Sequence, residues 1–431
     1  MNNVANLPEK RGKRVVIIGA GFAGLKLARS LSEKHFQVVL LDKNNYHQFQ
    51  PLFYQVATSG LEPSSISFPI RKILQHKKHV HFRVAELQKV RWEEKTIETS
   101  IGEMGYDYLV LALGANTNFF GNQNIERHAI SMKSVSEALL LRNRILENYE
   151  RALNTSHGME QESLMNVVIT GGGPTGVELA GAIAEMRQYV LPKDYPQLDF
   201  SKMTITLLEG SGRLLNGMSD HSGNNALKYL GGLNVKVRLN CLVEDYDGKE
   251  VKLKGGERIL SNTLIWAAGV RANGIAGFPD NSMGFGGRYK VDSFSRVEFN
   301  NDVFVIGDQS IMITEDRPNG DPQVAQVAIQ QAIRLNKNLT RLQQGKELDT
   351  FEYDDKGSMA TVGRNLAVCD LPYMKMKGFL AWLLWLFVHL MSILGAKNKV
   401  FVFINWAWSY VTYDQSLRLL IKPVEKKKYD N

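Results

Sequence analysis

The stretch RVVIIGAGFAG at residues 14–24 decides the fold of this 431-residue chain. Its first half is a β-branched run ending in glycine, which is typical of a buried parallel strand. An apolar-faced helix over residues 25–35 and a second strand, VVLLD at 38–42, follow. The glycines of the intervening turn are Gly19, Gly21 and Gly24. The strand ends in Asp42, eighteen residues after the last glycine and close to the ~20 of a dinucleotide-binding fingerprint.

The same pattern occurs a second time between residues 166 and 209. The strand NVVITG (166–171) leads into GGGPTGVELAGAIAEM, and a second strand over 203–209 ends in Glu209. The glycines of this turn are Gly171, Gly173 and Gly176. The acid follows the third glycine by 33 residues, because a polar, proline-containing insertion at 188–202 extends the helix end and its loop. Two such units in one chain form an internal repeat.

The chemistry of both turns favours a bound dinucleotide. Glycines lack a Cβ atom, so the backbone can approach a pyrophosphate, which then binds the free N–H groups of the helix N-terminus. The acid accepts hydrogen bonds from ribose hydroxyls, and Glu209 would repel a 2′-phosphate, which favours NADH over NADPH. A lone glycine turn is weak evidence, but two turns in the same strand–turn–helix–strand context strengthen the prediction.

The remaining pattern extends the α/β prediction. Each unit is followed by a strand that ends in small residues, at 108–115 and 263–270, and a third strand over 302–308 ends in Gly307-Asp308. Helices are expected over 134–153 and 325–342, a short β segment over 357–369, and apolar helices after it.

Composition and charge point to a membrane surface. With 44% hydrophobic and 22% charged residues, the chain is an ordinary globular protein and not a disordered or collagen-like one. Residues 361–431 contain ten of the Lys and Arg residues, four of the acids and four of the six tryptophans, so most of the net charge of +8 lies there. Basic residues beside apolar, Trp-rich segments favour an anionic lipid surface, and we expect no nucleic-acid partner.

Two apolar segments near the C-terminus are expected to attach the protein to that surface. Residues 378–395 would form a helix of ~27 Å, just under the ~30 Å hydrocarbon core. His389, Ser392 and two nearby lysines suggest a polar seam, however. The next segment, 400–422, carries a polar stripe on an otherwise apolar helix; its members are Asn405, Ser409, Thr412 and Ser416. We therefore expect two interfacial helices and not a transmembrane span.

Longer motifs resemble one family. The two nucleotide units and the Gly-Asp pair are similar to the two-dinucleotide-binding-domain flavoproteins. The following motifs resemble those of type II NADH dehydrogenases, the single-subunit, non-proton-pumping NADH:quinone oxidoreductases: HQFQPLFYQVATSGLEPSSISFPIR (47–71), GGGPTGVELAG (171–181), AQVAIQQA (325–332), VHLMSILGAKNK (388–399) and FINWAWSYVTYD (403–414). The resemblance runs from about residue 14 to 420.

The resemblance implies a set of functional residues. It implies non-covalent FAD in the first unit, NADH in the second, and a membrane quinone as electron acceptor. Glu178, Gln326 and Gln330 would border the flavin and quinone pocket. Asp308 would hold the ribitol of FAD, beside Gly19, Gly21, Gly24 and Asp42. Gly171, Gly173, Gly176 and Glu209 would hold NADH. The further candidate cofactor-binding residues are Lys43, Val84, Gly114, Ala325 and Gly269.

The predicted architecture is therefore α/β, with two Rossmann-like dinucleotide-binding domains for FAD and NADH plus a C-terminal amphipathic helical membrane anchor. The expected boundaries are 1–125 and 291–365 for the FAD-binding domain, with the quinone-site helix in its second part, 126–290 for the NADH-binding domain and 366–431 for the anchor. The missing EF-hand insertion and transit peptide favour a bacterial enzyme, peripheral and monotopic on the cytoplasmic face of the inner membrane. A homodimer is compatible with the resemblance.

Two alternatives stay open from the sequence. Sulfide:quinone oxidoreductases resemble this fold but use a cysteine pair beside the flavin, whereas Cys241 and Cys369 are better interpreted as structural thiols. A nucleic-acid-binding NADH flavoprotein would need its basic residues on a polar face. The histidines show no metal-ligand pattern; His76, His79 and His81 are expected in a solvated loop.

Overall fold

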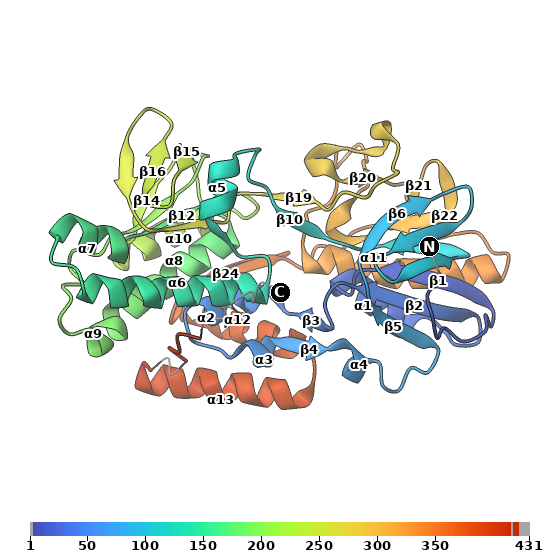
Figure 1. Cartoon of the computed structure of the whole chain (residues 1–431), viewed down its shortest axis with the longest axis horizontal. Helices are drawn as coiled ribbons and strands as arrows, with labels where there is room; N and C mark the ends of the chain where they lie inside the picture. Colours follow the sequence, from blue (N-terminus) through green and yellow to red (C-terminus); the bar gives the residue numbers. More distant parts are fainter. Residues whose placement is uncertain (1–2, 415–416, 422–431) are drawn as a thin grey trace, which may run out of the picture. The chain divides into compact units, whose positions relative to one another are not determined.

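The computed structural model describes residues 3–414 and 417–421, and it divides into two compact units (Figure 1). Unit 1 comprises Met1–Gln48, Ser67–Asn116 and Val270–Lys356. Unit 2 comprises Phe49–Ile66, Thr117–Gly269 and Gly357–Asn431. These boundaries differ from the predicted ones at 125/126, 290/291 and 365/366. The physical reason is packing: the chain enters and leaves unit 2 beside short strands, and Phe49–Ile66 packs on the helices of unit 2.

Unit 1 is built on a mainly parallel sheet with the strand order β21-β22-β9-β1-β2-β5. Its strands are β1 (Lys13–Ile18), β2 (Phe36–Asp42), β5 (Val80–Val84), β9 (Tyr108–Leu111), β21 (Arg296–Val297) and β22 (Asn300–Val305). β1 lies between β2 and β9 and is parallel to both, with Val15 opposite Val38 and Tyr108. The central strands are buried on both faces, which explains their continuous β-branched sequence.

Two helices of unit 1 pack on each other beside this sheet, namely α1 (Phe22–Ser30) and α11 (Ala325–Gln343). The remaining elements of unit 1 are short: β3 (Tyr46–Gln48), β4 (Ser67–Pro69), α4 (Ile70–Ile73), β6 (Leu87–Arg91), β7 (Thr96–Thr99), β8 (Gly102–Gly105), β10 (Ala115–Thr117), β19 (Val270–Ala272), η2 (Asp280–Ser282), η3 (Phe285–Gly287), β20 (Tyr289–Lys290), η4 (Gly307–Gln309) and β23 (Ser310–Ile311). β10 and β19 lie at two of the five places where the chain passes from one unit to the other.

Unit 2 repeats the parallel sheet, with the order β11-β18-β12-β13-β14. Its strands are β11 (Ile130–Ser131), β12 (Val167–Thr170), β13 (Ile205–Leu208), β14 (Lys236–Arg238) and β18 (Thr263–Trp266). Two antiparallel sheets accompany it: β15 (Val243–Tyr246), β16 (Glu250–Leu253) and β17 (Arg258–Leu260), then β24 (Ser358–Gly363), β25 (Leu366–Leu371) and β26 (Met374–Lys377). The β segment expected at 357–369 is thus a three-stranded sheet.

Helices surround these sheets of unit 2. They are α2 (Phe53–Ala57), α3 (Pro63–Ile66), α5 (Gln123–His128), α6 (Val135–Leu153), α7 (Gly158–Met165), α8 (Pro174–Tyr189), α9 (Leu191–Asp194), α10 (Asp220–Gly232), α12 (Phe379–Ser392) and α13 (Ala396–Thr412), after the short η1 (Gln50–Leu52). Ser134 begins α6, because its hydroxyl accepts a hydrogen bond from the N–H of Glu137, whose carboxylate in turn accepts one from Lys133 N. The helix α8 lies close against β24: a Cβ at Gly181 would collide with Val362 O.

Some expected elements differ from the structure. The first helix ends at Ser30 and not at residue 35, because the backbone of Leu31 is extended. His81 lies in β5 and the side chain of His79 is largely buried, so the solvated-loop prediction was wrong for these two histidines. The last helix ends at Thr412, where Tyr413 adopts a left-handed conformation, and not at residue 422, which lies outside the described residues.

The C-terminal helices α12 and α13 form a hairpin around Gly395, which has a φ of +79°. The predicted polar stripe is present on α13, and it faces the protein: Asn405, Ser409 and Thr412 are half-buried. Ser416 lies outside the described residues. The outer face is apolar instead. Its most exposed side chains are Phe379, Leu380, Phe387 and Met391 on α12 and Val400, Phe401, Phe403, Ile404, Trp408 and Val411 on α13.

The lengths of the helices bear on whether the apolar segments lie at the membrane interface or cross the membrane. Within residues 3–414 and 417–421, no helix combines the length and the hydropathy that crossing a membrane requires. The apolar segment 378–395 is divided by the end of α12 at Ser392, so its helix is only 14 residues long.

Candidate functional site

The first glycine turn of unit 1 has the geometry that a dinucleotide requires. A Cβ at Gly19 would collide with Ala112 O, and one at Gly24 would collide with Gly19 O. Around Gly21, at the N-terminus of α1, a Cβ would meet nothing within 4 Å. The turn is therefore tightly packed on its inner side and open where a phosphate would approach the helix.

Asp42 supports this turn from the end of β2. Its Oδ2 accepts a hydrogen bond from Ala20 N at 2.6 Å, and its Oδ1 accepts one from Asn44 N at 2.7 Å. Burial raises the pKa of this carboxyl, and the two backbone donors oppose the shift. Each carboxylate oxygen has a second lone pair, so ribose hydroxyls can still bind here.

The Gly307-Asp308 pair belongs to η4, which packs against α11. Gly307 has a φ of +74°, and its N–H donates to Gln331 Oε1 at 2.6 Å. Gln323 Nε2 donates to the backbone oxygen of Asp308 at 2.7 Å. A Cβ at Gly307 would contact Ala328 at 3.5 Å. The loop is thus held rigidly against the helix by Gln331, a residue that the sequence prediction did not single out.

The other candidate FAD residues vary in exposure. Gly114 has open space around its Cα and a φ of +69°. Lys43 and Val84 are exposed at the ends of their strands, and Ala325 is half-buried at the first position of α11. These positions are consistent with a ligand that lies along the carboxyl edge of the sheet.

The second turn, in unit 2, repeats the geometry of the first. Cβ atoms at Gly171 and Gly176 would collide with backbone atoms, whereas around Gly173 a Cβ would meet nothing within 4 Å. Glu209 plays the part of Asp42: its Oε2 accepts from Gly172 N at 2.5 Å, and its Oε1 accepts from Ser211 N at 2.8 Å. The longer connection before the acid therefore leaves the fingerprint geometry intact.

Gly269, a candidate cofactor-binding residue, lies three residues after β18. Its φ is +89°, and a Cβ there would lie 3.3 Å from the ring of Phe120, whose side chain is 70% exposed. A small residue is thus required beside an exposed aromatic ring, a combination suited to a flat ligand.

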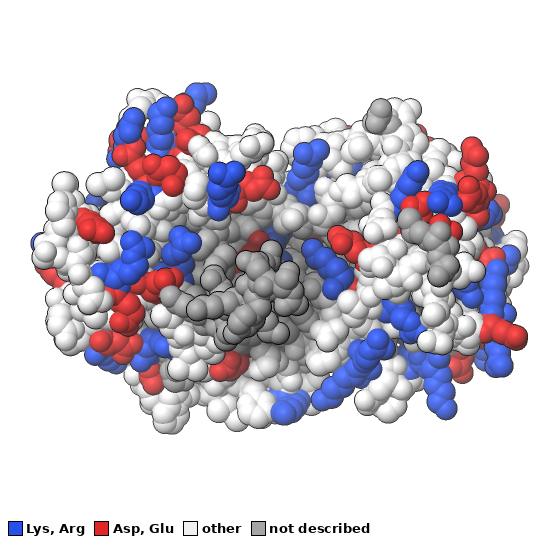
Figure 2. Space-filling view, viewed as in Figure 1, with Lys and Arg blue, Asp and Glu red and all other residues white. Residues whose placement is uncertain are grey.

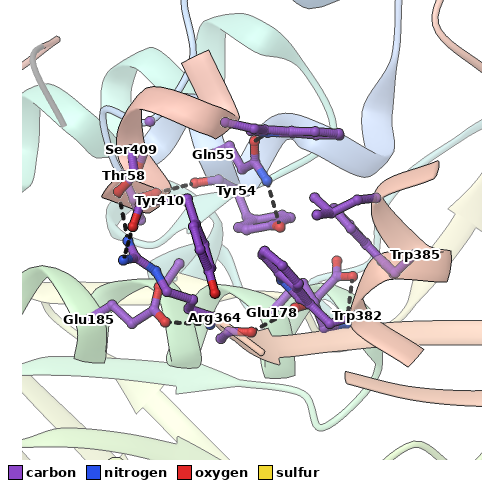
Figure 3. A pocket seen from close by; sticks show the side chains of 16 residues that line it. Tyr54, Gln55, Thr58, Glu178, Glu185, Arg364, Trp382, Trp385, Ser409 and Tyr410 are labelled. Atoms are coloured by element: carbon purple, nitrogen blue, oxygen red, sulfur yellow. Dashed lines mark hydrogen bonds between the residues drawn. The ribbon is translucent and has the colours of Figure 1, made fainter. Parts of the chain in front are cut away.

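A separate cavity of about 110 Å³ lies within unit 2 (Figure 3). Four parts of the chain line it: α2, α8, the turn between β24 and β25, and the C-terminal helices. Its polar and aromatic lining residues are Tyr54, Gln55, Thr58, Glu178, Glu185, Thr361, Arg364, Trp382, Trp385, Trp406, Ser409 and Tyr410. An aromatic wall with two carboxyls suits a flat, partly polar ring.

Glu178 is the most deeply placed charged group of the cavity. Burial raises the pKa of its carboxyl to about 8, while the backbone N–H of Thr361, 3.4 Å away, and the Trp385 indole oppose the shift. Glu178 is therefore mainly protonated at pH 7 and can donate a hydrogen bond. The indole N–H of Trp385 interacts with the Glu178 carboxyl but makes no hydrogen bond of ordinary geometry, so it can still donate to a ligand.

The helix α13 is fixed over the cavity by polar contacts of its inner face. Trp406 Nε1 donates to Gln55 Oε1 at 2.7 Å, and Gln55 Nε2 donates to Tyr54 Oη at 2.9 Å. The guanidinium of Arg364 donates to the backbone oxygens of Ser409 and Tyr410, both at 2.9 Å. These contacts fix which face of α13 is turned toward the cavity.

The residues that were predicted to border the quinone belong to both units. Glu178 lines the cavity of unit 2, whereas Gln326 and Gln330 lie on α11 of unit 1. The amide of Gln330 is engaged by the backbone of Asp354, through bonds of 2.8 and 3.0 Å. Sequence reasoning missed Tyr54, Glu185, Arg364 and the cavity tryptophans. The density of Trp in the last sixth of the chain was the available signal, but it was assigned to lipid contact alone.

Comparisons with known proteins identify the family. The model of the pyridine nucleotide-disulphide oxidoreductases matches residues 13–332, and that of the NDH2 C-terminal domain matches residues 356–412. The type II NADH:quinone oxidoreductases Ndh and NdhA of Mycobacterium tuberculosis are 32% and 34% identical to this chain, over 93% and 92% of it and 89% and 87% of their own lengths. The chain belongs to the type II NADH:quinone oxidoreductases.

Solved structures agree with this fold. NDH2 from Plasmodium falciparum in complex with NADH superposes with a TM-score of 0.86 at 22% identity, covering 96% of this chain and all of the other. The sulfide:quinone oxidoreductase of Aquifex aeolicus gives 0.71 at 17% identity, covering 92% and 91%. The family resemblance inferred from the sequence is confirmed, as are FAD and NADH as the cofactors of this NADH:quinone reductase.

Proposed function

We propose that this enzyme reduces a membrane quinone in the cavity of unit 2, without moving protons across the bilayer. The observation that carries the proposal is the combination of a protonated carboxyl, an available indole donor and aromatic walls in one cavity. Two hydrogen-bond donors suit the two polar oxygens and flat ring of a quinone. Bound FAD supplies the redox chemistry, accepting a hydride equivalent from NADH and delivering two electrons to the quinone.

The binding roles follow from the two glycine turns. We propose that Gly19, Gly21 and Gly24, with Asp42 and Asp308, hold FAD in unit 1. The candidates Lys43, Val84, Gly114 and Ala325 complete that site. In unit 2, Gly171, Gly173, Gly176 and Gly269 would hold NADH. The residues fit these roles because the open space at Gly21 and Gly173 lies at the N-termini of α1 and α8.

Glu209 sets the choice of nucleotide in this proposal. Its carboxylate is fixed by Gly172 N and Ser211 N at the place where the adenosine ribose would bind, so it should repel a 2′-phosphate. We expect the kcat/KM of the wild type to be at least 100-fold lower for NADPH than for NADH. Glu209→Gln should reduce that preference by about tenfold, mainly through the KM for NADPH. Asp220→Gln, which alters an exposed acid on α10, is the matched control. Equal use of both nucleotides by the wild type would contradict the assignment.

The apolar outer face of α12 and α13 supports attachment to a membrane surface. Single exposed apolar side chains are ordinary, but a face of this size marks an interaction site. The surface over α13, along the lower edge of Figure 2, is mainly uncharged. Lys397 and Lys399 lie at the start of the same helix, where they would contact anionic lipid at ~1 kcal/mol each. We propose that the enzyme is monotopic and lies on the cytoplasmic face of the membrane. A homodimer is also compatible with this fold.

The alternative of sulfide oxidation has less support. Both cysteines are free thiols of unit 2, and Cys369 is buried in β25 beside Ala381, where burial raises the pKa of its thiol. A raised pKa opposes the thiolate that a sulfur relay needs.

A photoreactive quinone analogue tests the proposed site. Irradiated with the holoenzyme, it should label peptides that contain Trp385 or Glu178, and a natural quinone should compete. Labelling of the α11 peptide around Gln326 would instead favour the quinone site that the sequence motif predicts. Labelling of neither segment would contradict both.

A further inference from the structure

A second carboxyl, Glu185, lines the same cavity as Glu178 and has no role in the site described so far. Glu185 is half-buried, whereas Glu178 is only 8% exposed. Its Oε1 accepts a hydrogen bond from Arg364 N at 2.5 Å and lies against Gly363. The cavity thus has one carboxyl deep inside and another nearer to its edge.

The reaction requires a proton from solvent. NADH supplies only a hydride, so reduction of a quinone to a quinol follows NADH + H⁺ + quinone → NAD⁺ + quinol. If Glu178 donates a proton to the quinone oxygen, its carboxylate must be protonated again before the next turnover. A group this deeply buried has little direct contact with water, so the new proton needs a path.

The geometry of α8 provides that path. Glu178 and Glu185 are seven residues apart, so they lie on the same face of α8, about 10 Å apart along its axis. Tyr54 lines the same cavity, and burial together with both carboxylates raises the pKa of its hydroxyl. A cavity of about 110 Å³ can hold several ordered waters, and the Trp385 indole N–H and the two carboxyls are polar partners for them.

The groups around Glu185 leave it able to exchange protons. The Arg364 side chain is turned away: it binds Ser409 O and Tyr410 O, and it stacks over Tyr413 at 3.6 Å. The backbone N–H of Arg364, and not its side chain, donates a hydrogen bond to Glu185. Burial raises the pKa of the Glu185 carboxyl, and Arg364 opposes this shift. Burial therefore favours the protonated form, while Arg364 favours the carboxylate. Tyr54 from α2, Glu178 from α8 itself and Tyr410 from α13 are the other titratable groups of the cavity.

We propose that Glu185 is the proton-entry residue of this enzyme: it takes a proton from solvent and returns it, through Tyr54 or cavity water, to the Glu178 carboxylate. In each turnover one O–H bond forms on Glu185 as hydronium or water gives up its proton. That bond breaks as the proton moves on, and Glu178 regains the proton it gave to the quinone. Glu185 acts through Glu178 and is a positioning and relay residue. The inference rests on the proposed quinone site.

The test is Glu185→Gln in the full-length holoenzyme, followed by stopped-flow absorbance of the flavin. The amide oxygen of glutamine can still accept from Arg364 N, so packing is preserved while the exchangeable proton is lost. Flavin reduction by NADH should stay within twofold of wild type. Flavin reoxidation by a short-chain quinone should slow by about 10-fold, fall more steeply as pH rises, and recover partly with added formate or azide as small proton carriers.

Three comparisons make the result decisive. Glu126→Gln, an exposed acid of α5, should change nothing. Glu185→Asp, which keeps the acid, should retain more activity than Glu185→Gln. If reoxidation and its pH profile are unchanged in Glu185→Gln while Glu178→Gln is slow, the relay is wrong and the quinone site stands. If Glu185→Gln and Glu178→Gln both behave as wild type, the proposed quinone site is wrong.

Discussion

Replacing Glu178 by glutamine should slow flavin reoxidation by quinone about 100-fold, while flavin reduction by NADH remains nearly unchanged. The expected size follows from general acid catalysis, which contributes roughly 10²–10⁴ in rate. Burial raises the pKa of Glu178 to about 8, so the carboxyl is the protonated donor at pH 7 and loses that proton above pH 8. Wild-type reoxidation should therefore fall as the pH rises through 8, and the variant should lack this inflection.

Stability provides a second readout for the same variant. The folded state holds the Glu178 proton up to a pKa of about 8, whereas an unfolded glutamate titrates near 4.5. Between these values the folded state binds more protons, so the contribution of this group to stability is complete below pH 4.5 and is lost as the pH rises toward 8. Thermal unfolding of Glu178→Gln should depend less on pH in that window. A pH dependence equal to wild type in both measurements would contradict a buried, protonated Glu178.

Replacing three apolar side chains on the outer face of α12 and α13 should release the enzyme from membranes. In Leu380→Glu, Phe387→Glu and Val411→Glu combined, each site changes from an exposed apolar side chain to a charge. Full burial of such side chains in lipid contributes ~1.5–3 kcal/mol each, so together they outweigh the two lysines. We expect more than 100-fold weaker binding to anionic vesicles in a sedimentation assay, with flavin content and short-chain quinone activity retained.

The matched control is Phe285→Glu, because Phe285 is 73% exposed but belongs to unit 1. This variant should sediment with vesicles as wild type does. High salt alone should not release the wild-type protein, since apolar contacts dominate. Complete release of wild type by salt, or sedimentation of the triple variant with vesicles, would show that the outer face of these helices is not the lipid-binding surface.

The glycine turns could be predicted from the sequence because their geometry is local. Gly24 and Gly176 are each required by a backbone oxygen five residues earlier, that of Gly19 and Gly171. Gly19 and Gly171 are required in addition by the neighbouring strand, and the regular strand–turn–helix pattern predicts that strand. The long helices were predicted for the same reason. The helix expected at 134–153 occurs as α6, and its capping residues are adjacent in the sequence.

The cavity could not be predicted, because segments more than 300 residues apart build it. Gln55 and Trp406 meet only in the folded chain, and nothing in either segment specifies the other. The glutamines of α11 illustrate the same limit. Spacing gave equal weight to Gln326 and Gln330, whereas packing engages the amide of Gln330 with Asp354 and uses the neighbouring Gln331 to hold Gly307. The direction of the polar stripe on α13 likewise depends on what lies beneath it.

The helices α12 and α13 present one face to the cavity and the other to the outside, and this sharing affects how inhibitors act. Trp385 and Trp406 form cavity walls, while Phe387 and Trp408 on the same helices are exposed. If lipid covers the outer face, a hydrophobic compound reaches the site from the bilayer and not from bulk water. Its effective concentration is then set by partition into the lipid. In that case inhibitor potencies for this enzyme have meaning only together with the lipid-to-water ratio of the assay.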